Sequence, residues 1–223
     1  MSDSVISRAS TLTEQVYQVL KQRITSGAYP GGYHLVERQL AKEFGISKTP
    51  VREALARLER EGLVLFEAGR GMRVRLLDPV EVDQILELRE LLEGFIAEKA
   101  AILGDASQTQ MLESIVLQSE ALPASNIEDY KALDEQFHKL IREMAQNKVL
   151  TNVIDSLQAQ ISLVMATTIT LPGRRTASVK EHRDIFEAIQ AKDPRAAGEY
   201  ARLHMRNARR AIKQRWEEHP PSV

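Results

Sequence analysis

The stretch that decides the fold of the N-terminal region is residues 45–63, GISKTPVREALARLEREGL. Gly45 ends the preceding segment and Gly62 ends the predicted helix. Ser47 is suited to cap this helix, and Pro50 falls in its first turn, where proline is tolerated. Between them, apolar residues recur at helical spacing. They are Val51, Leu55 and Leu58. The pattern predicts a helix over about residues 48–61 with one buried stripe.

The polar side of this helix carries groups that suit nucleic acid. Lys48, Thr49 and Arg52 lie near its start and away from the apolar stripe. Cations, hydroxyls and the free N–H groups of a helix start can bind phosphates and base edges in a major groove. The alternative interpretation is a set of solvated charges on a small helical domain.

The flanking sequence completes a winged helix-turn-helix plan. Residues 11–14 (TLTE) have the form of a capping box, and they open a helix that Gly27 ends. A short helix is predicted over residues 37–44. After residue 62 the apolar residues alternate around the turn 69–71 (GRG), which predicts a β-hairpin. Arg70 at the tip of this hairpin suits the adjacent minor groove or the DNA backbone.

Residues 11–76 resemble, without gaps, the DNA-binding domain of GntR-family transcriptional regulators. The resemblance is carried by residues 30–41 (PGGYHLVERQLA), 45–55 (GISKTPVREAL) and 57–63 (RLEREGL). It implies operator contacts from Arg38, Ser47, Lys48, Thr49, Arg52, Arg70 and Gly71. Lys48 stands where arginine is commoner in the family, and lysine keeps the charge but lacks the bidentate fork for guanine.

The remaining sequence predicts a second, all-α domain. We expect a flexible N-terminus (residues 1–10), a DNA-binding domain (11–77) and a helical domain (78–223). Caps, glycines and prolines divide the last into six predicted helices. They span about residues 79–103, 106–121, 126–146, 148–170, 177–191 and 194–217. The expected fold class is mainly α, with a small β-hairpin wing in the first domain and a six-helix bundle in the second.

Four polar residues fall on or beside apolar faces of these helices. They are Asp134, His138, His182 and His204. The first two are four residues apart and so share a helical face. An aspartate and three neutral imidazoles that converge in a bundle would suit a divalent transition metal. The alternative is a set of core histidines satisfied by hydrogen bonds. Two further histidines are expected on the surface or in loops: His34 and His219.

Arg89 aligns with apolar residues of the first C-terminal helix, so we expect it to point toward the core. A buried guanidinium needs an anion. Two interpretations stay open. One is an internal ion pair with Glu93 or Glu135, and the other is a clamp for a ligand carboxylate.

The C-terminal region resembles the ligand-binding domain of the FadR subfamily of GntR regulators. Residues 134–138 (DEQFH), 181–189 (EHRDIFEAI) and 204–205 (HM) carry the resemblance, with Asn147 and residues 87–93 in support. Many members bind a divalent metal through one aspartate and three histidines, with small organic acids beside it. The matching residues are Asp134, His138, His182 and His204, with Arg89 beside the ligand. Six helices instead of seven suggest the VanR-like branch.

Composition limits the function classes. The 223 residues include no cysteine, which excludes disulfides, cysteine-ligated zinc fingers, iron–sulfur clusters and a cysteine nucleophile. No apolar run reaches ~18 residues, so we expect a cytoplasmic protein without membrane contact. Residues 1–77 hold twelve Lys and Arg against eight Asp and Glu, whereas residues 78–223 hold eighteen against twenty-three. The N-terminal part of the chain (residues 1–77), which we call the head, is therefore basic, and the C-terminal part (residues 78–223) is acidic.

These observations predict a homodimeric, ligand-responsive transcription factor and not an enzyme. Two heads would bind a palindromic operator, and the helical domain would bind a small organic-acid effector beside the metal. Repression relieved by the effector is the commonest logic in such families. Zn²⁺ is the favoured metal, with Ni²⁺ and Mn²⁺ as alternatives. Two other classes stay open: a DNA-binding helical protein with a purely structural metal, and a metal-dependent hydrolase.

Overall fold

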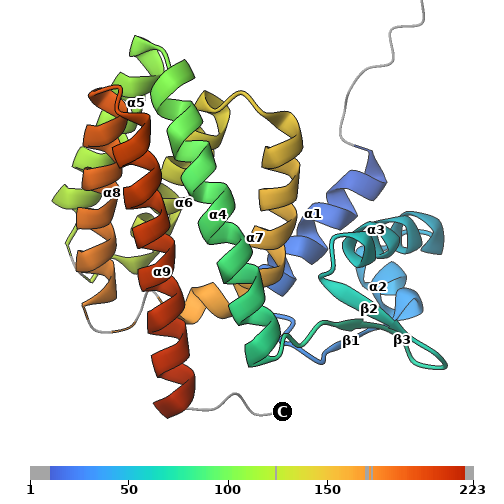
Figure 1. The fold of residues 1–223 in the computed structure, drawn as a ribbon. Coiled ribbons are helices and arrows are strands. Elements are labelled where there is room, and N and C mark those ends of the chain that lie inside the picture. Colours follow the sequence, from blue (N-terminus) through green and yellow to red (C-terminus); the bar gives the residue numbers. More distant parts are fainter. Residues whose placement is uncertain (1–10, 124, 169–170, 172, 219–223) are drawn as a thin grey trace, which may run out of the picture. The chain divides into compact units, whose positions relative to one another are not determined.

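The computed structural model describes residues 11–123, 125–168, 171 and 173–218 (Figure 1). The chain divides into two compact units, one that extends to Leu77 and one that starts at Asp78. Two expectations fall outside the described residues: the flexible N-terminus over residues 1–10 and the surface position of His219.

The N-terminal unit contains three helices, α1 (Leu12–Thr25), α2 (Glu37–Phe44) and α3 (Lys48–Arg60). α1 begins where the sequence predicts, because the Thr11 hydroxyl accepts a hydrogen bond from the backbone N–H of Glu14. α2 ends at Gly45, whose φ of 67° lies in the left-handed region that glycine adopts readily. α1 and α3 pack on each other, and the predicted apolar stripe of α3 is buried.

A small antiparallel sheet completes this unit. Its strands are β1 (His34–Leu35), β2 (Val64–Glu67) and β3 (Gly71–Val74), in the spatial order β1-β3-β2. β2 and β3 form the predicted hairpin, so the winged helix-turn-helix plan is confirmed. β1 was not expected, because two residues are too few for an alternating pattern to predict a strand. His34 lies in β1 and is exposed, as expected.

The C-terminal unit contains six helices among its described residues. They are α4 (Pro79–Leu103), α5 (Ala106–Ala121), α6 (Ile127–Met144), α7 (Lys148–Thr168), α8 (Arg174–Gln190) and α9 (Pro194–Glu218). Asp78 caps α4, and Asp105 opens α5 with a capping box that Gln108 closes. α8 begins at Arg174, earlier than the predicted residue 177, because Gly173 adopts a left-handed conformation directly before it.

α4 lies along α9 in this unit (Figure 1). Two glycines allow the close approach: Gly94 faces Arg202, and Gly198 faces Glu98, so a Cβ at either position would collide with the opposite side chain. Those two long side chains form an ion pair of 2.9 Å. Apolar residues of α4, α5, α6, α8 and α9 share one core, and these helices position the polar groups described next. No helix within the described ranges is both long and apolar enough to cross a membrane.

Candidate functional site

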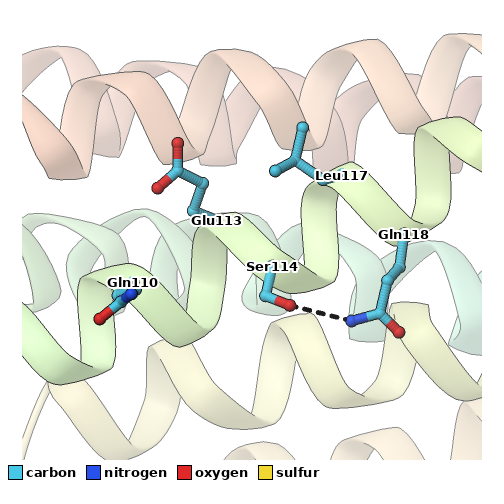
Figure 2. Close-up of a pocket in the computed structure, with 5 residues that line it drawn as sticks. All are labelled: Gln110, Glu113, Ser114, Leu117 and Gln118. Atoms are coloured by element: carbon cyan, nitrogen blue, oxygen red, sulfur yellow. Dashed lines mark hydrogen bonds between the residues drawn. The ribbon is translucent and has the colours of Figure 1, made fainter.

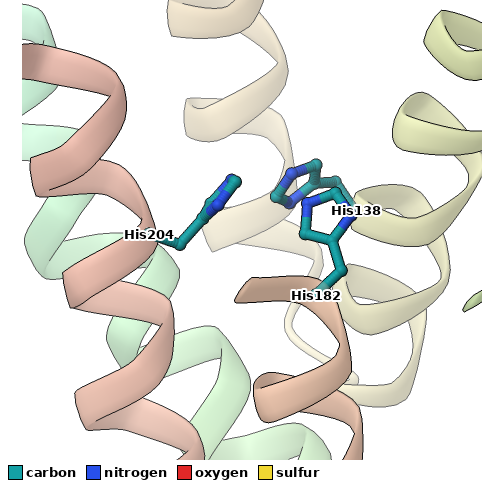
Figure 3. Close-up of side chains that lie close together, drawn as sticks. All are labelled: His138, His182 and His204. Carbon is teal, nitrogen blue, oxygen red and sulfur yellow. The ribbon is translucent and has the colours of Figure 1, made fainter. Parts of the chain in front are cut away.

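Three histidines from three helices meet inside the C-terminal unit. His138 on α6, His182 on α8 and His204 on α9 point toward one another (Figure 3). Each offers one ring nitrogen, and these nitrogens lie within 4.8 Å of one another. The ring centroids are separated by 4.8 to 5.3 Å. The structure thus brings together three of the four residues that the sequence assigned to a metal site, and we call them the three-histidine cluster.

Asp134, the fourth of those residues, lies beside the cluster. It is one turn before His138 on α6, and its Oδ1 is 3.7 Å from Nε2 of His182, which is too long for a hydrogen bond. The side chain is half-buried, and desolvation raises the pKa of its carboxyl above the usual value. Asp134 is therefore adjacent to the close group of imidazoles without belonging to it.

Burial keeps the imidazoles of His138 and His182 neutral. It lowers the pKa of both well below the usual range, and the nearby imidazoles and arginines lower these pKa values further by opposing another positive charge. The ring of Phe137 stacks on His182 with a centroid separation of 4.1 Å and fixes its plane. A neutral imidazole keeps the lone pair that a metal ion needs.

The donor set fits a divalent transition metal. Nε2 of His182 is buried and has no hydrogen-bond partner among the described residues, and a buried polar atom is costly unless something binds it. Metal–imidazole bonds of about 2.0–2.1 Å place ligand nitrogens about 3.3 Å apart in a tetrahedral site, so small ring rotations suffice. A cavity of about 10 Å³, lined by His138, His204 and Glu93 among others, has room for about one water.

His204 is held by a carboxylate that the sequence analysis did not single out. Its Nδ1 lies 2.7 Å from Oε2 of Glu181, and Glu181 also accepts hydrogen bonds from Arg174 and Asn207. Burial alone would raise the pKa of Glu181, but the hydrogen bonds from His204 and Arg174 outweigh burial and lower the pKa to about 2. The sequence held no local signal for this contact, because Glu181 and His204 lie on different helices, α8 and α9.

Arg89 is buried on α4 and pairs with Glu93 one turn later. Its Nη2 lies 2.9 Å from Oε1 of Glu93, and both side chains are almost fully buried. Of the two acids that the sequence offered as partners, Glu93 is the one used, and Glu135 is exposed. Nε and Nη1 of Arg89 have no hydrogen-bond partner in the described part of the chain, so donors for a ligand carboxylate are present.

The predicted DNA-contact residues lie at the surface of the N-terminal unit. All are exposed except Gly71, which is half-buried: Arg38, Ser47, Lys48, Thr49, Arg52 and Arg70 are the exposed ones. Ser47 precedes α3 without using its side chain for a capping bond, and the first turn of α3 has no acidic residue. The free N–H groups and positive dipole of this helix start therefore meet no competing carboxylate within the turn.

Arg52 has a partner that the sequence did not predict. Its Nε and Nη2 donate to the two carboxylate oxygens of Glu37 on α2, at 3.0 and 2.9 Å. Arg70 similarly pairs with Glu67 at 3.3 Å. Both arginines are about 70% exposed, so solvent and salt screen these pairs, and a phosphate or base edge can replace the carboxylate.

A larger hollow, of about 400 Å³, lies on α5 (Figure 2). It is lined by Gln110, Glu113, Ser114, Leu117 and Gln118. All of these residues come from one helix, and the Gln118 amide already donates to the Ser114 hydroxyl. An open surface on a single helix lacks the convergent polar groups of a binding site, so we assign no function to it.

Comparison with known proteins identifies the family. Residues 12–74 match the gntR family of bacterial regulatory proteins, and residues 84–207 match the FCD domain. The chain belongs to the GntR family and, with its FCD domain, to the FadR subfamily. It is a DNA-binding transcriptional regulator, and its family is not one of enzymes.

Similar proteins align over nearly the whole chain. The HTH-type transcriptional regulator YdhC of Bacillus subtilis is 29% identical over 220 residues, which are 98% of each protein. The HTH-type transcriptional repressor RspR of Escherichia coli is 25% identical over 95% of this chain and 93% of its own. The fold is similar to that of E. coli McbR/YncC, with a TM-score of 0.80, 22% identity and coverage of 92% of this chain and 99% of that one.

Proposed function

We propose that this regulator is a repressor whose operator affinity is controlled by a small carboxylate, bound beside a divalent metal in the FCD domain. The three-histidine cluster carries the proposal, because its buried, unpartnered Nε2 of His182 calls for a bound cation. His138, His182 and His204 would hold the metal, with Asp134 as fourth ligand, and Zn²⁺ ahead of Ni²⁺ and Mn²⁺. When bound, the metal would supply a Lewis-acidic position for an anionic ligand.

A role in repression, as opposed to activation, is supported by the similar protein RspR, which is described as a repressor. We assign operator contacts to seven residues of the head: Arg38, Ser47, Lys48, Thr49, Arg52, Arg70 and Gly71. Their exposure and the absence of an acidic residue in the first turn of α3 support this assignment. An operator-binding protein works where the chromosome is, so we place it in the cytoplasm.

The effector must rearrange the site in order to bind. The cavity beside His138 and His204 holds about one water, which is too little for an organic acid. Two buried donors of Arg89, Nε and Nη1, could bind the carboxylate of such an acid. A ligand that opens the packing around Arg89 and Glu93 favours one conformation over another, and this differential affinity is what regulation requires.

We propose that the active species is a homodimer. α4 exposes an apolar stripe at helical spacing, which a second copy can cover. Its residues are Leu88, Leu91, Phe95 and Ile102, each between 41% and 60% exposed. A two-fold dimer matches a palindromic operator.

The function is tested with the 223-residue chain and duplexes tiled across the intergenic DNA beside its own gene. At two salt concentrations, we expect tight, salt-sensitive binding to one palindromic tile. Equal affinity for every tile would contradict sequence-specific binding by the head.

A structural metal is distinguished from a sensing one by repeating the assay with small carboxylic acids. The acids are added to zinc-loaded and to chelator-treated protein. If the metal takes part in sensing, we expect at least one acid to weaken operator binding only when zinc is bound. If zinc removal lowers the melting temperature and no acid changes operator binding in either form, the metal is structural.

A further inference from the structure

We infer that Glu181 is a positioning residue for the metal site: it selects the tautomer of His204 and holds its ring so that Nε2 is the nitrogen offered to the metal. The inference rests on the proposed metal site. It is supported by hydrogen bonds between α8 and α9 that hold the Glu181 carboxylate. A cluster of three histidines could form without these bonds.

The contact between the two side chains is short and buried. Nδ1 of His204 lies 2.7 Å from Oε2 of Glu181, and the side chains are 7% and 12% exposed. An ionised carboxylate can only accept hydrogen bonds, so the imidazole nitrogen facing it must carry the proton. In the neutral ring the proton is then on Nδ1, and the lone pair of Nε2 is the one left for a metal.

The remaining lone pairs of Glu181 are also satisfied. Arg174 donates to both carboxylate oxygens at 2.9 to 3.0 Å, and the amide of Asn207 donates to Oε1 at 2.8 Å. Arg174 is on the same helix as Glu181, whereas Asn207 is one turn after His204 on α9. The carboxylate is therefore fixed from both helices and is not free to swing toward the metal as a ligand itself.

The other two histidines pack against the ring of Phe137, which His138 meets edge to face with a centroid separation of 5.5 Å. His182 is fixed by stacking on Phe137, and its Nε2 has no hydrogen-bond partner within the described residues. His204 makes no such stack with Phe137 in the described residues, and its orientation depends on the hydrogen bond to Glu181. Loss of an outer-shell partner of this kind typically weakens metal binding by about 10–100-fold.

The test compares Glu181→Gln with the matched control Glu120→Gln. Glu120 also forms a two-bond pair with an arginine, Arg183, between α5 and α8, but it makes no hydrogen bond with the three-histidine cluster. Zinc affinity is measured by competition with a chromophoric chelator. We expect a loss of about 10–100-fold for Glu181→Gln and an unchanged affinity for Glu120→Gln. Equal affinity of Glu181→Gln and wild type would overturn the inference.

A second readout needs no metal and no variant of Glu181. Long-range ¹H–¹⁵N NMR of the metal-free wild-type chain reports which nitrogen of each histidine is protonated, and His204→Ala identifies the His204 signals by their loss. The spectra are recorded at a pH high enough that the ring carries one proton, and we expect that proton on Nδ1. A proton on Nε2 instead would refute the inference. Failure of the wild type to bind zinc would instead refute the proposed metal site while the tautomer result stands.

Discussion

The two units contain arginine–glutamate pairs of the same length in opposite environments. In the head, Arg52 and Glu37 are 2.9 Å apart, and the arginine side chain is 71% exposed. In the FCD domain, Arg89 and Glu93 are also 2.9 Å apart, and the arginine side chain is 4% exposed. Water and salt screen the first pair, so DNA can replace Glu37 easily. The two charges of the second pair are too buried for water to hydrate them, so anything that separates Arg89 from Glu93 must supply new hydrogen-bond partners.

The largest effect that this comparison predicts is on stability. Glu93→Ala leaves the Arg89 charge buried without a partner, and we expect the free energy of unfolding of the FCD domain to fall by about 3–5 kcal/mol. Trp216 is the only tryptophan and lies on α9, so its fluorescence reports urea unfolding of this unit. Glu128→Ala removes an exposed partner of Lys131 on α6 and should leave the transition almost unchanged. Equal effects of the two variants would contradict the contrast between buried and exposed pairs.

The next effect concerns metal binding. His182→Ala removes a buried ligand of the proposed site, and we expect zinc affinity to fall by more than the ~100-fold upper range of outer-shell losses. His34→Ala, which changes an exposed histidine on β1, is the matched control and should bind zinc as the wild type does. Titration against a competing chelator measures both. Full zinc occupancy of His182→Ala would remove this histidine from the site.

A smaller effect is expected for operator binding. Arg52→Ala should weaken binding to the specific operator by about 5- to 150-fold and relax base preference, with an unchanged far-UV circular-dichroism spectrum. Arg60→Ala, at the far end of α3, serves as the control and should lower operator affinity less. Fluorescence anisotropy with a labelled duplex provides both affinities. A larger loss for Arg60 than for Arg52 would move the contact surface to the other end of the helix.

The smallest effect on operator affinity is expected for Arg70, in the turn of the β2–β3 hairpin. Arg70→Ala should weaken binding to specific and unrelated duplexes alike and should lower the slope of log affinity against log salt by about one. The same anisotropy titration at four salt concentrations measures that slope. An unchanged slope would mean that Arg70 does not contact a phosphate.

The sequence predicted elements that depend on local rules and missed contacts between distant segments. Capping residues located the starts of α1, α4 and α5, and glycine at residue 45 located the end of α2. β1 is too short to carry a pattern, and it exists because β3 pairs with it.

The same division holds for the candidate site. Helical spacing placed the three histidines on apolar faces, and the fold brings them together. The partners of Arg52 and His204 lie 15 and 23 residues away in the sequence and on other helices, so no local rule identifies Glu37 or Glu181.

The most direct test of the account measures zinc content and operator affinity together in the wild type, His182→Ala and Arg52→Ala. We predict about one zinc per chain in the wild type and Arg52→Ala, and none in His182→Ala. In metal-free buffer, His182→Ala should still bind the operator, whereas Arg52→Ala should not bind it tightly. Loss of zinc from Arg52→Ala, or a loss of operator binding in His182→Ala as large as that in Arg52→Ala, would contradict the separation of DNA recognition at the surface from metal binding in the buried cluster.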